Sequence, residues 1–560
     1  MRTIPLLSLV VLGFAVVAAC GDDPSGQPPP GSASSGGPPG SSDDGGSGGD
    51  GGTVDPAPVD PIAPSTTTCA LEPLADIGGA TAVANEGELR AALAAGGKVR
   101  MTADITATAS FVVTKPTVLD GGGFTLSGGQ STHLITARMT DLTVQNITIR
   151  DGKNLVPKSE HFSAQSGAAI MISGGNGTSD GPATGSLKVI KATFLGNRAE
   201  QPSDGDIRGG AVYLFNLPDA TFSEVIFRDN FAVSGGAIGG LGSSLSIAAS
   251  VFQGNHGNNA GRGGELDGTG GAISLDALSQ NKKTAYFRIC GSRFKDNRAV
   301  RLGGAIYFVN HWKTGSAVEI RQSSFEGNET TSTTQGQGGA IFAMDDDKYP
   351  GNSGPDNQMS VTESLFTKNA TWGQGGGLWF WTKDGSLLLR NTTFHENSTN
   401  PAHALGMGGG LAVSSGPATI MSCTFAGNYA KFHGGGIQGT SSVSMGNTLF
   451  VDNRSNRDGG YAKFHTNDPV ATDLGGNRQF LTQNLSIDVN SDALVSQDAV
   501  RGDPKLGPLA DNGGPTMTMA IPEGSVARNS GVAGPNVPEV DQRLEKRDGE
   551  PDVGAFEVVP

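Results

Sequence analysis

Residues 318–342 read VEIRQSSFEGNETTSTTQGQGGAIF, and this stretch contains a unit that is repeated along the chain. The unit has Phe325 followed by Asn328, and then a Gly-Gly pair that leads into Ala340 and Ile341. Its Phe-x-x-Asn core occurs nine times, with 25 to 42 residues between successive phenylalanines. The copies are Phe194 and Asn197, Phe227 and Asn230, Phe252 and Asn255, Phe294 and Asn297, Phe325 and Asn328, Phe366 and Asn369, Phe394 and Asn397, Phe425 and Asn428, and Phe450 and Asn453. A repeat of this length predicts a solenoid or an array of small units.

The residues around each phenylalanine indicate which solenoid this is. In the quoted copy, Val318 and Ile320 are two residues apart, which is typical of a strand with one inward face. The three-residue step from Ile320 to the small residue Ser323 indicates a bend or bulge before a second strand. The Gly-Gly-Ala-aliphatic segment predicts a third strand, with glycine where the backbone turns or is closely approached. We therefore expect a parallel β-helix in which phenylalanine stacks on phenylalanine and asparagine on asparagine.

Weaker turns precede these nine copies. Short strands are predicted at 112–113, 118–120, 124–126, 142–144 and 147–149, because Gly or Asn separates these apolar pairs. Asn85 and Glu88 have the spacing of a helix capping box, and the helix that they open is expected to end at Gly96. We expect this short amphipathic helix to cap the open end of the solenoid.

Composition restricts the classes of function. The chain has 560 residues, of which 86 are glycine and only 17% are charged. Its 39 basic and 54 acidic residues give a formal net charge of −15, and no basic stripe is present, so we expect no nucleic-acid partner. Four cysteines are too few for a disulfide scaffold of this length.

The N-terminus predicts export. A basic start and an apolar run from Ile4 to Ala19 have the form of a secretion signal, and this run is too short to favour a spanning helix. Residues 17–20, Val-Ala-Ala-Cys, resemble a bacterial lipobox, which implies cleavage before Cys20 and lipidation of its thiol. The alternative is an ordinary signal peptide that contains a cysteine. Residues 20–68 are dominated by Gly, Ser, Pro and Asp, so we expect them to form a disordered tether.

The repeats resemble those of the polymorphic outer-membrane proteins, and the chain from about residue 70 to 480 resembles right-handed parallel β-helix proteins of the pectate-lyase-like class. Residues 503–516, together with Asp541-Gln542-Arg543 and residues 552–557, resemble the choice-of-anchor Q family of bacterial surface proteins. Neither a translocating barrel nor a C-terminal sorting signal is recognised, so we expect the anchor to be Cys20. These resemblances imply an all-β, right-handed parallel β-helix on a bacterial outer membrane or cell surface.

The expected organisation is therefore a signal peptide at 1–19, a tether at 20–68, the β-helix at 69–470 and a choice-of-anchor Q-like region at 471–560. The last region contains Asp-Gly and Asn-Gly pairs that suit short hairpins. We expect it to form a small module that caps the last coil.

Aromatic residues suggest a binding face. The outward position after the aliphatic residue of the third strand is occupied by Tyr307, Phe342 and Trp379 in three successive copies, with Trp381 and Trp312 nearby. A flat aromatic strip suits sugar rings or an apolar partner patch. The hypothesis is adhesion or glycan contact, with a polysaccharide or a host or neighbouring cell surface as partner. The alternative is that loops such as 342–358 fold over the strip and bury it.

Acidic residues suggest a weaker possibility. Asp345, Asp346 and Asp347 lie beside Lys348 in an expanded corner, and Glu265 and Asp267 lie in another. These corners are solvated loops, a divalent-ion site for which Ca²⁺ is the candidate, or part of a catalytic groove. The catalytic alternative is a Ca²⁺-dependent polysaccharide lyase or a glycoside hydrolase, and it requires these acids to converge with Arg321 or Arg390. We assign no catalytic residue and no cofactor other than this possible Ca²⁺.

Isolated polar residues receive simpler interpretations. Cys423 occupies the small-residue column, so it is expected to be a buried free thiol. Cys69 and Cys290 are available to pair, although the sequence does not require it. His311, His395 and His433 lack metal-ligand spacing and are expected at the surface or at corners.

Overall fold

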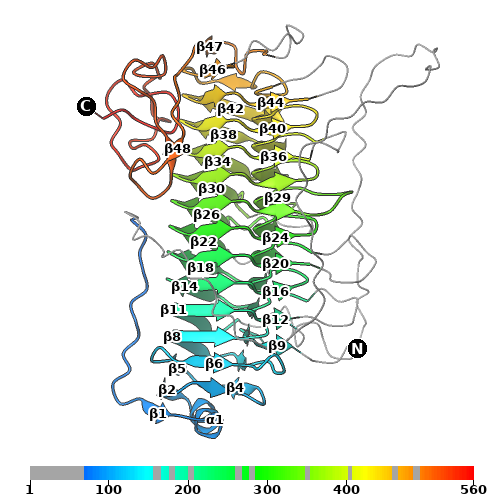
Figure 1. The fold of residues 1–560 in the computed structure, drawn as a ribbon, viewed down its shortest axis with the longest axis vertical. Helices are drawn as coiled ribbons and strands as arrows, with labels where there is room; N and C mark the ends of the chain where they lie inside the picture. Colours follow the sequence, from blue (N-terminus) through cyan, green and yellow to red (C-terminus); the bar gives the residue numbers. More distant parts are fainter. Residues whose placement is uncertain are drawn as a thin grey trace, which may run out of the picture. The chain divides into compact units, whose positions relative to one another are not determined.

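The computed structural model describes residues 68–154, 166–175, 183–199, 207–258, 268–276, 284–346, 354–400, 406–456, 464–482 and 492–559. Cys20, Glu265, Asp267, Asp347 and Lys348, together with the expected signal peptide and the tether up to residue 67, lie outside these ranges. The described strands form a right-handed parallel β-helix, as predicted, with three stacked parallel sheets (Figure 1).

One coil shows how the quoted sequence folds. Strand β26 (Ala317–Arg321) is followed by a bend at Gln322, whose φ is +52°, and then by β27 (Ser324–Glu326). Asn328 turns the chain into the two-residue strand β28 (Glu329–Thr330), a segment that sequence analysis did not predict. Gly338 and Gly339 lead into β29 (Ile341–Asp345). A Cβ atom on Gly338 would overlap the carbonyl oxygen of Ile341, and one on Gly339 would overlap that of Gly376 in the next coil.

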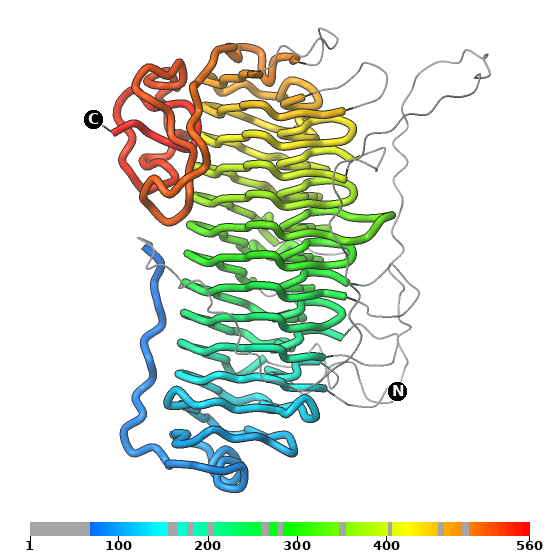
Figure 2. Tube along the Cα trace, in the orientation of Figure 1, coloured from blue at the N-terminus to red at the C-terminus, as the bar shows by residue number. Residues whose placement is uncertain are grey.

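Each part of the coil stacks on the same part of its neighbours, as the repeated turns of the tube in Figure 2 show. Sheet A contains the two strands on either side of the bend and sheet C the two-residue strands, while sheet B contains the strands that follow the glycine pair. The first ladder of sheet A is β1 (Thr81–Val83), β2 (Gly97–Met101), β5 (Thr117–Asp120), β8 (Asp141–Arg150), β11 (Ser186–Leu195), β14 (Asp219–Ser223), β18 (Leu245–Ala248), β22 (Tyr286–Cys290), β26, β30 (Gln358–Thr362), β34 (Ser386–Arg390), β38 (Ala418–Met421), β42 (Val443–Gly446) and β45 (Thr472–Asp473).

The second ladder of sheet A shares the long strands β8 and β11. Its other members are β3 (Ile105–Thr106), β6 (Thr125–Ser127), β15 (Ile226–Arg228), β19 (Val251–Gln253), β23 (Arg293–Lys295), β27, β31 (Leu365–Thr367), β35 (Thr393–His395), β39 (Thr424–Ala426), β43 (Leu449–Val451), β46 (Arg478–Phe480) and β47 (Val500–Arg501). The parallel ladder therefore extends beyond residue 470.

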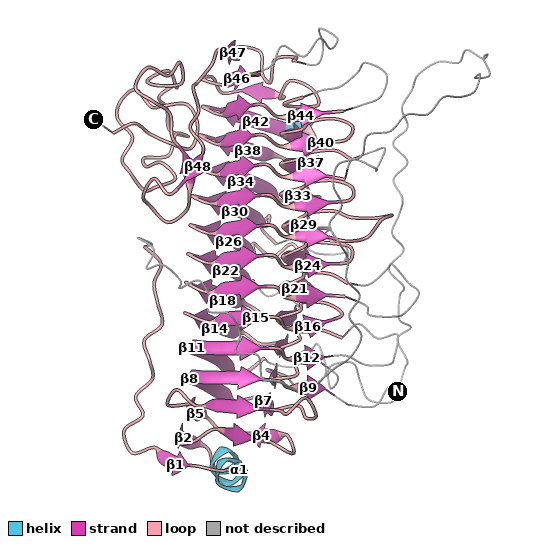
Figure 3. Cartoon of the chain, in the orientation of Figure 1, coloured by secondary structure: helices cyan, strands magenta, loops and turns pink. Residues whose placement is uncertain are grey.

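Sheets B and C complete the coils, and Figure 3 shows how strongly strands dominate the described chain. Sheet B is β4 (Phe111–Val113), β7 (Ile135–Arg138), β10 (Ile170–Ser173), β13 (Val212–Phe215), β17 (Ile238–Leu241), β21 (Ile273–Asp276), β25 (Ile306–Asn310), β29, β33 (Leu378–Thr382), β37 (Leu411–Ser415) and β41 (Ile437–Gln438). Sheet C is β9 (Lys153–Asn154), β12 (Arg198–Ala199), β16 (Phe231–Ala232), β20 (His256–Gly257), β24 (Arg298–Ala299), β28, β32 (Ala370–Thr371), β36 (Ser398–Thr399), β40 (Tyr429–Ala430) and β44 (Arg454–Ser455). A 3-10 turn, η2 (Thr440–Ser442), follows β41.

The predicted phenylalanine column is confirmed. All nine rings, from Phe194 to Phe450, are buried and stack one on the next. Their centroids are 4.6–5.1 Å apart and their planes are inclined by 2–12°. The column fills the interior at the spacing of neighbouring parallel strands.

The predicted asparagine ladder is also confirmed. From Asn197 to Asn428, each side-chain Nδ2 donates to the Oδ1 of the asparagine in the next coil at 2.8–3.0 Å, and Asn453 accepts the last of these bonds. The amide of Asn328 also donates to the backbone oxygen of Phe294 at 3.0 Å, while the backbone N–H of Asn328 donates to Asn369. Each buried amide in the ladder therefore has its partners in adjacent coils, which fixes their register.

The ladder ends at His465, which occupies the interior beyond Asn453 and lies 3.3 Å from its amide nitrogen. Burial lowers the pKa of His465 to about 4, so the ring is neutral at pH 7 and its Nδ1 accepts from Asn453.

The N-terminal helix is confirmed as α1 (Glu86–Ala95), which covers the first coils (Figure 3). Asn85 Oδ1 accepts from the Glu88 N–H at 3.0 Å, and the helix ends at Gly96, whose φ is +79°. Leu89, Ala92 and Leu93 form the buried face of the helix.

The segment before α1 runs along the outside of the rod. Residues 68–80, which we call the strap, extend along the flank of sheet A (blue in Figure 1). Cys69 forms a disulfide with Cys290 in β22, so the two cysteines that sequence analysis left open are paired. Further along the strap, the Glu72 N–H donates to Ser223 Oγ and the Ala75 N–H to Gln145 Oε1.

The C-terminal region lies on the same flank, farther along the rod. Strands β45–β47 continue the solenoid, whereas residues 503–559, which include the antiparallel pair β48 (Leu509–Ala510) and β49 (Thr518–Met519), pack against the side of the later coils (Figure 1). Thr393 Oγ1 donates to Gln542 Oε1 at 2.6 Å, and Asn447 Nδ2 donates to the carbonyl of Val532 at 2.9 Å.

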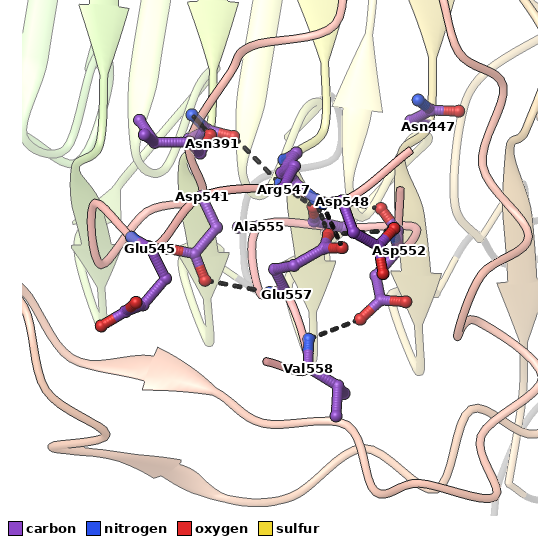
Figure 4. A network of polar contacts seen from close by, with 12 residues as sticks. Asn391, Asn447, Asp541, Glu545, Arg547, Asp548, Asp552, Ala555, Glu557 and Val558 are labelled. Atoms are coloured by element: carbon purple, nitrogen blue, oxygen red, sulfur yellow. Dashed lines mark hydrogen bonds and ion pairs between the residues drawn. The ribbon is translucent and has the colours of Figure 1, made fainter. Parts of the chain in front are cut away.

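A buried ion pair fixes this region to the rod. Arg547 Nη1 donates to Glu557 Oε2 at 2.8 Å, and Arg547 Nη2 donates to Asn391 Oδ1 at the bend of a coil (Figure 4). Glu557 also accepts from the Asp552 N–H, and Asp541 accepts from the Glu557 N–H. The motif residues at 541–543 and 552–557 thus build a docking core.

We expect Asn328→Ala to destabilise the rod by about 2–4 kcal/mol, because two donors of Asn297 lose their acceptor and the buried carbonyl of Phe294 loses its donor. The measurement is the midpoint of urea denaturation. Asn536→Ala, at an exposed position, is the control and should change stability by about 0.5 kcal/mol or less. Equal midpoints for the two variants would contradict the role of the ladder.

Candidate functional site

The strand register brings the predicted aromatic residues together on the outer face of sheet B. Tyr307 in β25 pairs with Phe342 in β29, which pairs with Trp379 in β33. The rings are stacked and nearly parallel, with centroids 5.4 Å apart for Tyr307 and Phe342 and 4.5 Å apart for Phe342 and Trp379. A second column beside them holds Val309, Met344 and Trp381.

The centre of this aromatic face is covered and its borders are accessible. Phe342 is 4% and Trp379 6% exposed, and Trp379 Nε1 donates to Gln374 Oε1 at 3.2 Å. Tyr307, Met344 and Trp381 are half-buried, and so is Trp312 in the loop after β25. The carbonyl of Trp312 accepts from Asn310 and from Asn357, both at 2.9 Å, which fixes that loop. Contact with a ligand is therefore restricted to the half-exposed residues.

A second apolar cluster on the same face was not predicted. It consists of Met171, Tyr213 and Phe215 with Leu241, from β10, β13 and β17. Tyr213 follows Gly209-Gly210-Ala211-Val212, which is the same offset from the glycine pair as Tyr307, so the repeat pattern contained the signal. Its ring is fully buried, which makes this cluster a packing feature.

A line of charged side chains connects neighbouring coils of sheet B, and its member Asp276 ends β21, which lies between the strands of the two apolar clusters. Arg208 Nη2 lies 2.8 Å from Asp276 Oδ2, the other oxygen of Asp276 lies 3.3 Å from His311 Nε2, and His311 Nδ1 lies 2.7 Å from Asp346 Oδ1. Arg208 reaches Asp276 across Gly239 of β17, where a Cβ atom would lie 2.5 Å from the Cβ of Arg208. Sequence analysis placed His311 among isolated surface residues, and in the structure it bridges two carboxylates.

The electrostatics of this line follow from its partners. Burial alone would lower the pKa of His311, but its hydrogen bonds and ion pairs with Asp276 and Asp346 outweigh burial and raise the pKa to about 9. Burial likewise opposes ionisation of Asp276, yet Arg208 and His311 hold its pKa below the usual range. At neutral pH His311 is therefore a cation and Asp276 an anion.

Asp345 points to different partners from Asp346. Its carboxylate is buried and accepts from Asn357 Nδ2 at 3.0 and 3.1 Å and from Thr382 Oγ1 at 3.4 Å. A cavity of about 20 Å³ beside it has room for one water molecule. The two described aspartates of the 345–347 run thus have different contacts: Asp345 accepts hydrogen bonds from Asn357 and Thr382, and Asp346 belongs to the charged line.

The arginines that the catalytic alternative needs lie elsewhere. Arg321 and Arg390 are in sheet A, in register with Thr362 between them, and both interact with Glu363 at the bend. They do not join Asp345 or Asp346, which belong to the end of β29 in sheet B. Across the described ranges, no group of three or more His, Cys, Asp or Glu side chains is arranged to hold a metal ion.

A larger hollow, of about 530 Å³, lies on the sheet A side of the first coils. Arg100, Asp120 and Lys191 line it together with Thr148 and Thr193. None of the residues predicted from the sequence as site residues borders this hollow.

Comparison with known proteins finds no family model that matches this chain and no curated protein that matches it. In the part of the chain that the structure describes, no helix has the length and apolar character needed to cross a membrane.

We expect His311→Gln to reduce the free energy of unfolding by about 1–3 kcal/mol at pH 7. Because the folded pKa of about 9 lies above the ordinary value of 6.5, the stabilisation is present below pH 6.5 and is lost as pH rises through 9. Urea denaturation at several pH values should therefore show wild type and variant converging near pH 10.

His256→Gln serves as the comparison, because burial lowers the pKa of His256 and its effect on stability has the opposite pH dependence. A constant difference between wild type and His311→Gln from pH 6 to 10 would contradict the ionised bridge.

Proposed function

We propose that this chain is a lipid-anchored protein of the bacterial outer membrane or cell surface that binds a glycan or a partner surface without catalysis, as an adhesin does. The observation that carries the proposal is the stacked aromatic face of sheet B, whose half-exposed Tyr307 and Trp381 lie next to the charged line of Asp276, His311 and Asp346.

This combination has the chemistry of a sugar-binding surface. Aromatic rings pack against the apolar faces of sugar rings, and Tyr307 and Trp381 retain exposed ring area for such contact. Carboxylates accept hydrogen bonds from sugar hydroxyls. The side chains of Asp276 and Asp346 are 26% and 16% exposed, so each is accessible at the edge of the face.

Display on a tether supports the same role. A flexible chain with the composition and length of residues 20–68 would separate the rod from the lipid expected at Cys20 by about 40 Å. The strap and the C-terminal region occupy the flank of sheet A, and neither packs on the outer face of sheet B through a described contact. Among the described residues of the aromatic face, Tyr307 and Trp381 keep exposed surface for a partner.

The first test is binding of the full chain to a polysaccharide array, with and without Ca²⁺, while released products are monitored. Tyr307→Ala and Trp381→Ala should each raise the dissociation constant by about two- to tenfold, because loss of one stacking contact costs about 0.5–1.5 kcal/mol. Tyr429→Ala, a half-buried tyrosine of sheet C, is the matched control and should bind like wild type.

Binding without turnover, weakened by the two face variants alone, supports the proposal. Release of unsaturated or reducing ends would overturn its non-catalytic part. Equal dissociation constants for Tyr307→Ala, Trp381→Ala and the control Tyr429→Ala would show that the aromatic face is not the binding site.

Anchoring is tested separately in a Gram-negative host. Cys20→Ser should abolish incorporation of a labelled fatty acid and move the chain out of the membrane fraction, whereas Cys423→Ser, at a buried thiol, should change neither. Fatty-acid labelling that persists in Cys20→Ser would contradict lipidation at Cys20.

A further inference from the structure

The chain that precedes residue 68 joins the rod near the middle of its length. Thr68 exchanges two hydrogen bonds with Gln322, at 3.0 and 2.9 Å, and Cys69 is bonded to Cys290 in β22. From this point the strap runs back along the flank and reaches the first coils, where Ala75 contacts Gln145 (Figure 2). The terminal strand β1 is therefore reached only after the strap has passed several coils.

Apart from the disulfide, the strap is held weakly. Its two ion pairs, Glu72 with Lys188 at 2.9 Å and Asp76 with Lys98 at 2.7 Å, join side chains that are 33–81% exposed, and pairs this exposed contribute little to stability. Leu71 and Leu74 are 49% and 43% exposed, so the strap buries little of its apolar surface. A few hydrogen bonds remain, each worth about 0.5–1.5 kcal/mol.

The disulfide closes a loop with a sequence separation of 221 residues. Tension applied from the N-terminal side enters the rod at Cys290, in a strand that is paired on both sides, with β18 and with β26. Without the bond, tension would reach β1, which pairs only with β2. Because each coil of a solenoid contacts only its neighbours, the end coil would then peel away first and the next would follow.

We propose that the Cys69–Cys290 disulfide transfers tension from the N-terminal side of the chain to the middle of the rod. The coils from β1 to β18 are thereby removed from the path of tension, and they stay folded while the chain is pulled. The relevance of tension rests on the proposed function, in which a tethered rod holds a partner. The mechanical property itself does not depend on any ligand or membrane.

The test is to pull single full-length molecules in optical tweezers, with handles at the two ends of the chain. In the oxidised chain, we expect the low-force stepwise release of the early coils to be absent. Reduction with a dithiol should add steps that sum to about 800 Å, since the 221-residue separation extends by about 3.6 Å per residue. These steps should come at lower force than the unfolding of the later coils.

The double variant Cys69→Ser/Cys290→Ser should behave like the reduced chain, and Cys423→Ser, which removes the buried free thiol, should behave like the oxidised one. Where the double variant does not fold, reduction of a folded wild-type molecule held at low force makes the same comparison. Low-force release of the early coils in the oxidised chain would overturn the proposal. So would a length gain after reduction that appears only above the force at which the later coils unfold. A loss of glycan binding with this mechanical pattern intact would count only against the proposed function.

Discussion

The buried asparagine amide is the constraint on which the rest of the structure depends. Each ladder asparagine places its amide in the buried interior, and its partners are the asparagine of the next coil and the backbone of the previous one. A coil that slipped by one residue would leave these groups unpaired and would turn its inward side chains outward. Hydrogen bonding at one corner thus sets the register of the phenylalanine column and of all three sheets.

Register at the corner determines what can be built on the surface. Because Ile306, Ile341 and Leu378 are held in line on the inside of sheet B, the residues after them are held in line on the outside. Tyr307, Phe342 and Trp379 therefore stack, although insertions of different length separate them in the sequence. The same alignment brings Asp276 and Asp346 to the two nitrogens of His311. The arrangement of the candidate site therefore follows from the register of the buried residues on the inner side of sheet B.

The bends in sheet A give the rod a second organised surface, which it uses to bind its own termini. One residue per coil adopts a left-handed conformation there, as at Gln322, Glu363, Asn391 and Asn447. The strap contacts the bend at Gln322, and the C-terminal region contacts the bends at Glu363, Asn391 and Asn447. Both terminal segments thus pack on one flank, which leaves the outer face of sheet B without a described contact from either.

The strands of sheets A and B, the bend and the two interior ladders could be predicted from the sequence, because these features recur at fixed offsets from Phe-x-x-Asn and depend on nearest neighbours. The two-residue strands of sheet C could not. The sequence also predicted that Tyr307, Phe342 and Trp379 lie on one face. The folded chain was needed to show that Phe342 and Trp379 are covered, that Cys69 pairs with Cys290, that His311 bridges two aspartates, and that residues 503–559 lie along the rod. These contacts join residues across insertions of unequal length or between the termini and the coils. No repeat offset specifies them, so they follow from which side chains meet once the coils have stacked.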